Sequence, residues 1–163
     1  MLKKLVILII AGMLLTGCSA PVYETLGEVE HVSATQPRQR KTVLEIPEDA
    51  AILTASGGDM LYSCGGYTMS LQSLAAGDLS STVRALSGYD LSQLTILETV
   101  CEDHTRYDWV WTSAGEMGDV VCRAAVLDDG NYHYCLTVST EAEKAGALSQ
   151  VWNELFRSFC LEK

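Results

Sequence analysis

One cysteine stands directly behind the apolar stretch that opens the chain. Residues 1–4 are a short basic leader, residues 5–15 are an unbroken apolar run, and Thr16 and Gly17 separate that run from Cys18. This order is typical of a secretory signal peptide, and the run is too short for a membrane-spanning helix, which needs about 20 apolar residues. The residue type at position 18 matters because a thiolate is a nucleophile that can take up a lipid group.

The segment Leu15-Thr16-Gly17-Cys18 closely resembles the lipobox of bacterial lipoproteins. The resemblance implies that Cys18 receives a diacylglyceryl group on its sulfur and that the chain is cut between Gly17 and Cys18. Acyl chains contribute about 0.8 kcal/mol per buried methylene, so two or more chains give stable anchoring. We therefore expect a lipoprotein held in the cell envelope, at the extracytoplasmic face of a bacterial membrane, with Cys18 as its lipidation site. A plain signal peptide followed by a chance cysteine is the alternative.

Composition narrows the possible partners. The chain has 11 Lys and Arg against 21 Asp and Glu, a net charge of −10, and removal of the leader takes away two further positive charges. Such an acidic protein is a poor candidate for binding nucleic acid or for electrostatic adhesion to anionic lipid. We expect no nucleic-acid partner and a membrane attachment that depends on the lipid.

The mature chain divides into a tether and one domain. Residues 1–17 are the expected signal peptide, residues 18–40 a lipid-anchored flexible tether, and residues 41–163 a single domain. The tether shows no sustained hydrophobic period, which favours a solvated linker over a folded element. The tether ends in a basic patch of Arg38, Arg40 and Lys41. We interpret the patch as solvated charges of a linker, and contact with lipid headgroups is the alternative.

Hydrophobic periods in the domain predict strands with two helices. Seven stretches have strand character: residues 42–46, 60–64, 67–73, 95–101, 106–112, 120–127 and 132–139. A helix over residues 75–88 should be capped by Asp78 and end at Gly88. A longer helix should begin at a capping box, Thr140 to Glu143, and run to about Phe159. Its apolar stripe is Leu148, Val151, Trp152, Leu155 and Phe159.

These elements predict an α+β fold with a mainly antiparallel sheet of five to seven strands. The four late strands have no crossover helices between them, which excludes a doubly wound α/β sheet. The short mid-chain helix is inserted between the strands, and the long C-terminal helix must pack on the sheet. Tyr107, Trp109 and Trp111 alternate onto one face of their strand. Trp109 and Trp111 are expected to belong to the hydrophobic core and not to a ligand-binding surface. Asp129-Gly130 is the best candidate for a type I′ hairpin turn.

The late part of the chain is similar to the PsbP-like fold, which includes the DcrB-type bacterial lipoproteins. The similarity lies in residues 106–111, 130–134, 152–156 and 158–159, and the order of elements extends it over residues 42–161. It implies strands, a mid-chain helix, a meander and a closing helix. That family has no common catalytic residues to carry over, and many of its members act as assembly or binding factors.

Five cysteines follow Cys18, at positions 64, 101, 122, 135 and 160. An exported domain meets conditions that permit disulfides, and free buried thiols are the alternative. A two-residue turn at Asp129-Gly130 would place Cys135 opposite Ala124, with Cys122 one diagonal away. A different register would place Cys122 and Cys135 directly opposite, close to disulfide spacing. Cys122–Cys135 is thus the possible disulfide.

No spacing in the chain is typical of a metal centre or a catalytic site. There is no Cys-x-x-Cys and no His-x-x-x-His, so we expect no metal and no cofactor. A cysteine nucleophile with His104 or His133, oriented by Asp108, is conceivable. No glycine-rich elbow or oxyanion segment accompanies these residues. We therefore expect no catalytic residues and no enzyme activity.

Three functions remain for a lipid-anchored domain of this kind. The first is an extracytoplasmic binding or assembly-factor domain without catalytic activity, whose partner is an unidentified protein of the envelope or the wall. The second is a lipoprotein that binds a small molecule or a metal in a pocket between the sheet and the C-terminal helix. The third is a thiol-dependent enzyme.

Overall fold

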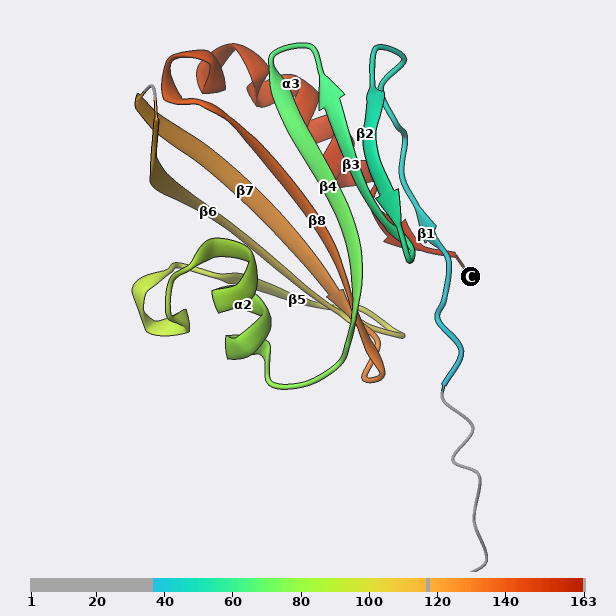
Figure 1. The fold of residues 1–163 in the computed structure, drawn as a ribbon. Helices are drawn as coiled ribbons and strands as arrows, with labels where there is room; N and C mark the ends of the chain where they lie inside the picture. Colours follow the sequence, from blue (N-terminus) through green and yellow to red (C-terminus); the bar gives the residue numbers. More distant parts are fainter. Residues whose placement is uncertain (1–36, 117, 163) are drawn as a thin grey trace, which may run out of the picture. The chain divides into compact units, whose positions relative to one another are not determined.

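The computed structural model describes residues 37–116 and 118–162, which build an α+β fold as predicted. The expected signal peptide, Cys18 and most of the expected tether lie outside the described residues. The large strands are β2 (Ala51–Ser56), β3 (Asp59–Cys64), β4 (Tyr67–Ala75), β5 (Leu97–Val100), β6 (Thr105–Gly115), β7 (Gly118–Asp128) and β8 (Tyr132–Glu141). They form one antiparallel seven-stranded sheet in the order β2-β3-β4-β8-β7-β6-β5 (Figure 1).

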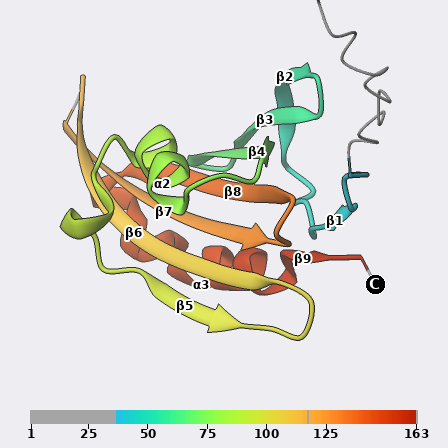
Figure 2. The same cartoon turned by 90° about the horizontal axis from the view of Figure 1, so that it is seen from below.

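Helices lie on both faces of this sheet (Figure 2). The short mid-chain helix α2 (Leu79–Ser87) is followed by a 3-10 turn, η1 (Leu91–Gln93), and the long helix α3 (Ala142–Ser158) closes the chain. After α3, the two-residue strand β9 (Cys160–Leu161) pairs with β1 (Thr42–Val43). The domain therefore ties its first described strand to its last one.

One hydrophobic cluster lies on each face of the sheet. Beneath α3 lie residues of β3, β4, β7 and β8 together with Trp152, Leu155 and Phe156 of the helix. Beneath α2 lie Val83 and the two tryptophans of β6, Trp109 and Trp111. The period-two pattern of β6 is thus confirmed, because both tryptophans are buried on the same face.

The mid-chain helix follows its predicted caps but starts later. Asp78 accepts a hydrogen bond from the backbone of Ser80, and Gly88 ends the helix in the left-handed conformation at φ +78°. Only glycine adopts this backbone region at little cost. The predicted start at residue 75 is wrong because β4 continues to Ala75 before the chain turns.

The start and the stripe of α3 differ from the prediction. Thr140 still belongs to β8, and its hydroxyl donates to the carbonyl of Gly66 at 2.6 Å, so it cannot cap the helix. Glu141 is the N-cap residue instead. Val151 is 41% exposed, whereas Phe156, which the predicted stripe omits, is fully buried.

The register of the β7–β8 hairpin determines how far apart Cys122 and Cys135 lie. Asp128 pairs with His133, so the turn lies one residue later than predicted, and Gly130 carries its positive φ of 84°. Cys122 lies opposite Ser139, and Cys135 lies opposite Val126. Four positions along a strand correspond to about 13 Å, far beyond disulfide reach. The expected Cys122–Cys135 bridge is not formed, and both thiols are free.

Contacts of the domain begin before Lys41. The carbonyl of Pro37 accepts a hydrogen bond from the hydroxyl of Tyr132 at 2.9 Å. Arg40 forms an ion pair with Asp103 at 2.6 Å, and its backbone N–H donates to the hydroxyl of Tyr134. The last residues assigned to the tether are therefore bound to the sheet, and part of the basic patch is neutralised there.

Candidate functional site

Helix α3 covers only part of its sheet face. It packs chiefly over β7 and β8, so that β5 and the part of β6 around Val110 lie beside it and remain exposed. Leu97 of β5 pairs with Asp108 of β6, and Val110 lies two positions further on, so these side chains share the α3 face. Leu97 is 65% exposed and Val110 is 57% exposed. An apolar shelf therefore borders the helix.

A cleft follows the boundary between this shelf and α3. It consists of two adjoining hollows of about 440 and 570 Å³, and both are lined by Leu97, Asp108, Arg123 and Asn153. The first hollow is also lined by Arg106 and Arg157. We call the two hollows together the arginine cleft. It is defined by Leu97, Arg106, Asp108, Arg123, Asn153 and Arg157. Strands β5, β6 and β7 and helix α3 all contribute to it.

Arg106 is fixed within the cleft by four hydrogen bonds. Its Nε and Nη2 donate to the two carboxylate oxygens of Asp108 at 2.6 and 3.0 Å. Its Nη1 and Nη2 also donate to the backbone carbonyls of Phe159 and Phe156, both at 2.9 Å. These carbonyls belong to the C-terminal end of α3, where unpaired acceptors and the helix dipole favour a cation. Arg106 therefore joins the helix end to the sheet.

Arg123 is less fully compensated than Arg106. Its Nη1 donates to Oδ1 of Asn153 at 2.8 Å, while its Nη2 lies 3.8 Å from Asp108, beyond hydrogen-bond distance. The guanidinium lies 4.1 Å above the ring of Phe156, a cation–π contact. Burial lowers the pKa of Arg123; the carboxylate of Asp108 opposes this effect and the nearby Arg106 adds to it.

The cleft is positive although the protein is acidic. Arg106, Arg123 and Arg157 are three of the four arginines that follow Lys41 in the sequence. Only one carboxylate, that of Asp108, lines the cleft with them. Arg157 is exposed and has no hydrogen bond or ion pair within residues 37–116 and 118–162. The cleft can thus attract an anionic group.

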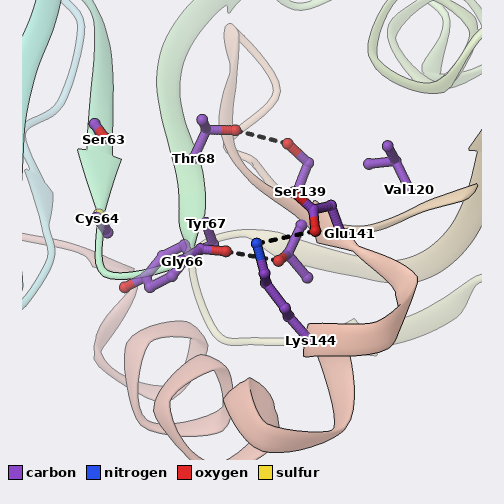
Figure 3. A pocket seen from close by; sticks show the side chains of 10 residues that line it. Ser63, Cys64, Gly66, Tyr67, Thr68, Val120, Ser139, Glu141 and Lys144 are labelled. Carbon is purple, nitrogen blue, oxygen red and sulfur yellow. Dashed lines mark hydrogen bonds and ion pairs between the residues drawn. The ribbon is translucent and has the colours of Figure 1, made fainter. Parts of the chain in front are cut away.

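Another hollow, separate from the arginine cleft, lies where β4, β8 and the start of α3 meet (Figure 3). Its two charged side chains are paired with each other, and so are two of its hydroxyls. Lys144 lies 2.9 Å from the carboxylate of Glu141, and the hydroxyls of Thr68 and Ser139 are hydrogen-bonded at 2.7 Å. Because these charges cancel locally, this hollow has no comparable attraction for a charged ligand.

The buried histidine serves as a tie between α2 and the sheet. His133 is fully buried, and its Nδ1 shares a hydrogen bond of 2.7 Å with the hydroxyl of Thr82. Its Nε2 faces Asp128 at 3.5 Å and has no hydrogen-bond partner. Buried polar atoms are usually hydrogen-bonded, and the bond to Thr82 is the hydrogen bond that the buried ring of His133 makes.

Replacing Thr82 by valine should therefore lower the free energy of unfolding. The shape of the side chain is kept, but Nδ1 of His133 loses its hydrogen bond, so that neither ring nitrogen has a hydrogen-bond partner, which costs about 1–3 kcal/mol. Denaturant unfolding measures this loss. Thr82→Ser keeps the hydroxyl and should lose less than Thr82→Val; an equal loss in both variants would contradict the role of the hydrogen bond.

The residues of the hypothetical thiol site lie in separate environments. His133 contacts Thr82 and Asp128, His104 contacts Asp103, and Asp108 is held by Arg106. The thiol of Cys135 reaches only the backbone carbonyl of His133. Burial raises the pKa of Cys135 to about 12 and also raises the pKa values of Cys64 and Cys122, which disfavours their thiolates.

Within residues 37–116 and 118–162, no group of three or more His, Cys, Asp or Glu side chains is placed to hold a metal ion. In the same part of the chain, no helix has the length and apolar character needed to cross a membrane.

The order of the strands, with a mid-chain helix and a closing helix, is similar to the fold of solved PsbP-like structures. The structure is similar to that of the cyanobacterial PsbP protein (CyanoP) from Synechocystis sp. PCC 6803, with a TM-score of 0.55 and 11% identity over 74% of this chain and 86% of that one. It is also similar to LpqN, involved in cell envelope biogenesis of Mycobacterium tuberculosis, with a TM-score of 0.52 and 10% identity over 80% and 88% of the two chains. At such identities the likeness confirms the fold alone. No protein-family model and no curated protein sequence matches this chain.

Sequence reasoning did not identify the arginine cleft. The sequence places Arg106 in a strand pattern and offers Asp108 as the orienting residue of a hypothetical thiol site, and no motif points to Arg123 or Arg157. One signal was available, because Arg106 and Asp108 alternate with Tyr107 and Trp109 and must point away from the aromatic core. The expectation of a pocket between the sheet and the C-terminal helix does agree with the position of the cleft.

Proposed function

We propose that this protein is a lipid-anchored extracytoplasmic binding domain without catalytic activity, which docks a protein of the cell envelope. The observation that carries the proposal is the outer margin of the sheet at β5, beside the arginine cleft. All four residues of β5 are exposed, with Leu97 at 65% and Val100 at 76%. Exposed apolar side chains on an unpaired edge are suited to binding another chain.

The edge of β5, which is unpaired within the described residues, is short and carries one charged residue, Glu98, but it has no bulge in its pairing with β6. Its sequence, Leu97-Glu98-Thr99-Val100, contains no proline or lysine. The edge at the other end of the sheet, β2, contains a register shift between Ile52 and Thr54, a bulge of the kind that disfavours pairing with a new strand. A partner that adds a strand would therefore meet fewer obstacles at β5.

The proposed location rests on the opening segment of the sequence. The basic leader, the apolar run and Leu15-Thr16-Gly17-Cys18 together favour export and lipidation. LpqN, a protein of similar fold, is described as involved in cell envelope biogenesis. An envelope binding or assembly role for this chain is in keeping with both observations.

A small-molecule-binding lipoprotein is the second candidate. The arginine cleft lies between the sheet and α3 and offers hollows of about 440 and 570 Å³. Pockets for small ligands fall in this size range. Both hollows are wide and shallow against an exposed edge, which favours a protein partner over an enclosed ligand.

Site-specific crosslinking in living cells tests the first proposal. A photo-crosslinking residue at Val100, in the full chain produced in its native bacterium, should capture one predominant protein. The matched control is the same residue at Leu53, an exposed apolar position on β2. Val100→Lys should reduce capture from a probe at Leu97, because edge lysines oppose strand pairing. Equal capture from β2 and β5, or no capture from β5, would overturn the proposal.

A further inference from the structure

We propose that the arginine cleft is a receptor for one carboxylate of the docking partner, bound by Arg123, Asn153 and Arg157 and flanked by an apolar side chain against Leu97 and Val110. This inference rests on the proposed function, because it names the chemical group that the partner presents. It predicts an acidic residue next to an aliphatic one in the bound segment.

The first step of the argument is an imbalance of charge around Asp108. Its two carboxylate oxygens are bound at 2.6 and 3.0 Å by Arg106, which leaves Arg123 at 3.8 Å. Two largely buried guanidinium groups therefore share one carboxylate. Burying a charge without a matching partner is costly, so a second carboxylate beside Arg123 would be stabilised.

The second step concerns the donors that remain free. Oδ1 of Asn153 accepts the hydrogen bond from Arg123, which leaves the amide N–H groups of Asn153 available. The guanidinium of Arg157 has no partner in the described residues and lines the same hollow. Arg106 is left out of the receptor because its bonds to Asp108 and to the end of α3 already use four of its five N–H donors.

The third step selects a carboxylate over a phosphate. Asp108 lies on the floor of the cleft and repels any anion that enters. A carboxylate carries one negative charge, whereas a phosphate monoester carries about 1.5 to 2 at neutral pH, so the repulsion is larger for phosphate. The planar guanidinium of Arg123 also matches the two oxygens of a carboxylate.

The fourth step explains the apolar requirement. Leu97 and Val110 lie on the same sheet face as Asp108 and remain more than half exposed. An aliphatic side chain that covers them would remove apolar surface of both residues from water, which is favourable. An acidic residue alone would leave this gain unused, and an apolar residue alone would leave Arg123 uncompensated.

Nuclear magnetic resonance of the arginine side chains in the purified full chain, held in nonionic detergent, tests the inference. The probe is a capped dipeptide, acetyl-Leu-Glu-amide, titrated while the Nε–H signals of the arginines are recorded. We expect saturable shifts for Arg123 and Arg157 and none for Arg84, an arginine on α2. Acetyl-Leu-Gln-amide, which lacks only the charge, should bind at least tenfold more weakly.

Variants and a competing anion complete the test. Arg157→Gln, at an exposed position, should weaken binding of the dipeptide severalfold, whereas Arg84→Gln should leave it unchanged. Inorganic phosphate that bound more tightly than the dipeptide would overturn the choice of carboxylate. Equal binding of the Glu and Gln dipeptides, or no saturable shift, would overturn the receptor itself. Crosslinking at Val100 would still report on the proposed function in that case.

Discussion

Replacing Arg106 by methionine is expected to lower the free energy of unfolding by about 3 kcal/mol, the lower end of the cost of removing one partner from a buried ion pair, because this pair is partly buried. Methionine keeps much of the aliphatic stem but removes all four hydrogen bonds of the guanidinium. Asp108 then loses its bidentate partner, and the carbonyls of Phe156 and Phe159 at the end of α3 lose their donor. Equilibrium denaturation of the purified protein measures the change.

Arg157→Met is the matched control, because it makes the same substitution in the same cleft. Arg157 is exposed and unpaired within the described residues, so its replacement should change stability by less than about 0.5 kcal/mol. Adding Asp108→Leu to Arg106→Met should recover part of the loss, since both members of the buried pair are then apolar. Equal losses from Arg106→Met and Arg157→Met would show that the tie between helix and sheet contributes little.

The fold could be predicted where one face of an element is buried. Trp109 and Trp111 alternate on β6, and their spacing alone indicates a strand with an apolar face. Asp78 and Gly88 mark the caps of α2 because each residue type satisfies a specific backbone requirement. In these places local chemistry and tertiary packing favour the same structure.

Other elements could not be predicted, since their signal depends on tertiary contacts. Residues 51–56 form β2 although none of them is buried, so no period-two pattern distinguishes them from a loop. Thr140 resembled a helix cap, but its hydroxyl donates to the carbonyl of Gly66, in the turn before β4 and far away in the sequence. The turn at Gly130 shifted by one residue, and that shift alone changed which residues face Cys122 and Cys135.

The arginine cleft belongs to this second group. Its three arginines come from β6, β7 and α3, and no local spacing relates Arg106, Arg123 and Arg157. Only the order β7-β6-β5, together with the position of α3, brings them to one hollow. The net negative charge of the chain did not indicate these arginines either, because a total charge says nothing about where positive side chains cluster.

Replacing Cys18 by alanine is expected to abolish acylation completely. The lipid is attached to the sulfur of Cys18 in the proposed pathway, and alanine offers no nucleophile at that position. Metabolic labelling with an alkyne fatty acid, followed by intact-mass analysis, measures the result. The label should be absent, and the chain should keep its leader, because the cut before residue 18 depends on the lipidated cysteine.

Cys160→Ala is the matched control, since Cys160 is an exposed free thiol within the domain. That variant should keep the full label and the mature N-terminus at Cys18. A chain that starts at Ser19 behind an ordinary secretory signal should move from the membrane to the soluble extracytoplasmic fraction, because two or more acyl chains are what anchors the protein stably. Label retained on Cys18→Ala would assign the lipid to another residue. Residues 18–40 would then not be the tether between the lipid and the domain, and the domain would have to reach its partner at β5 without that tether.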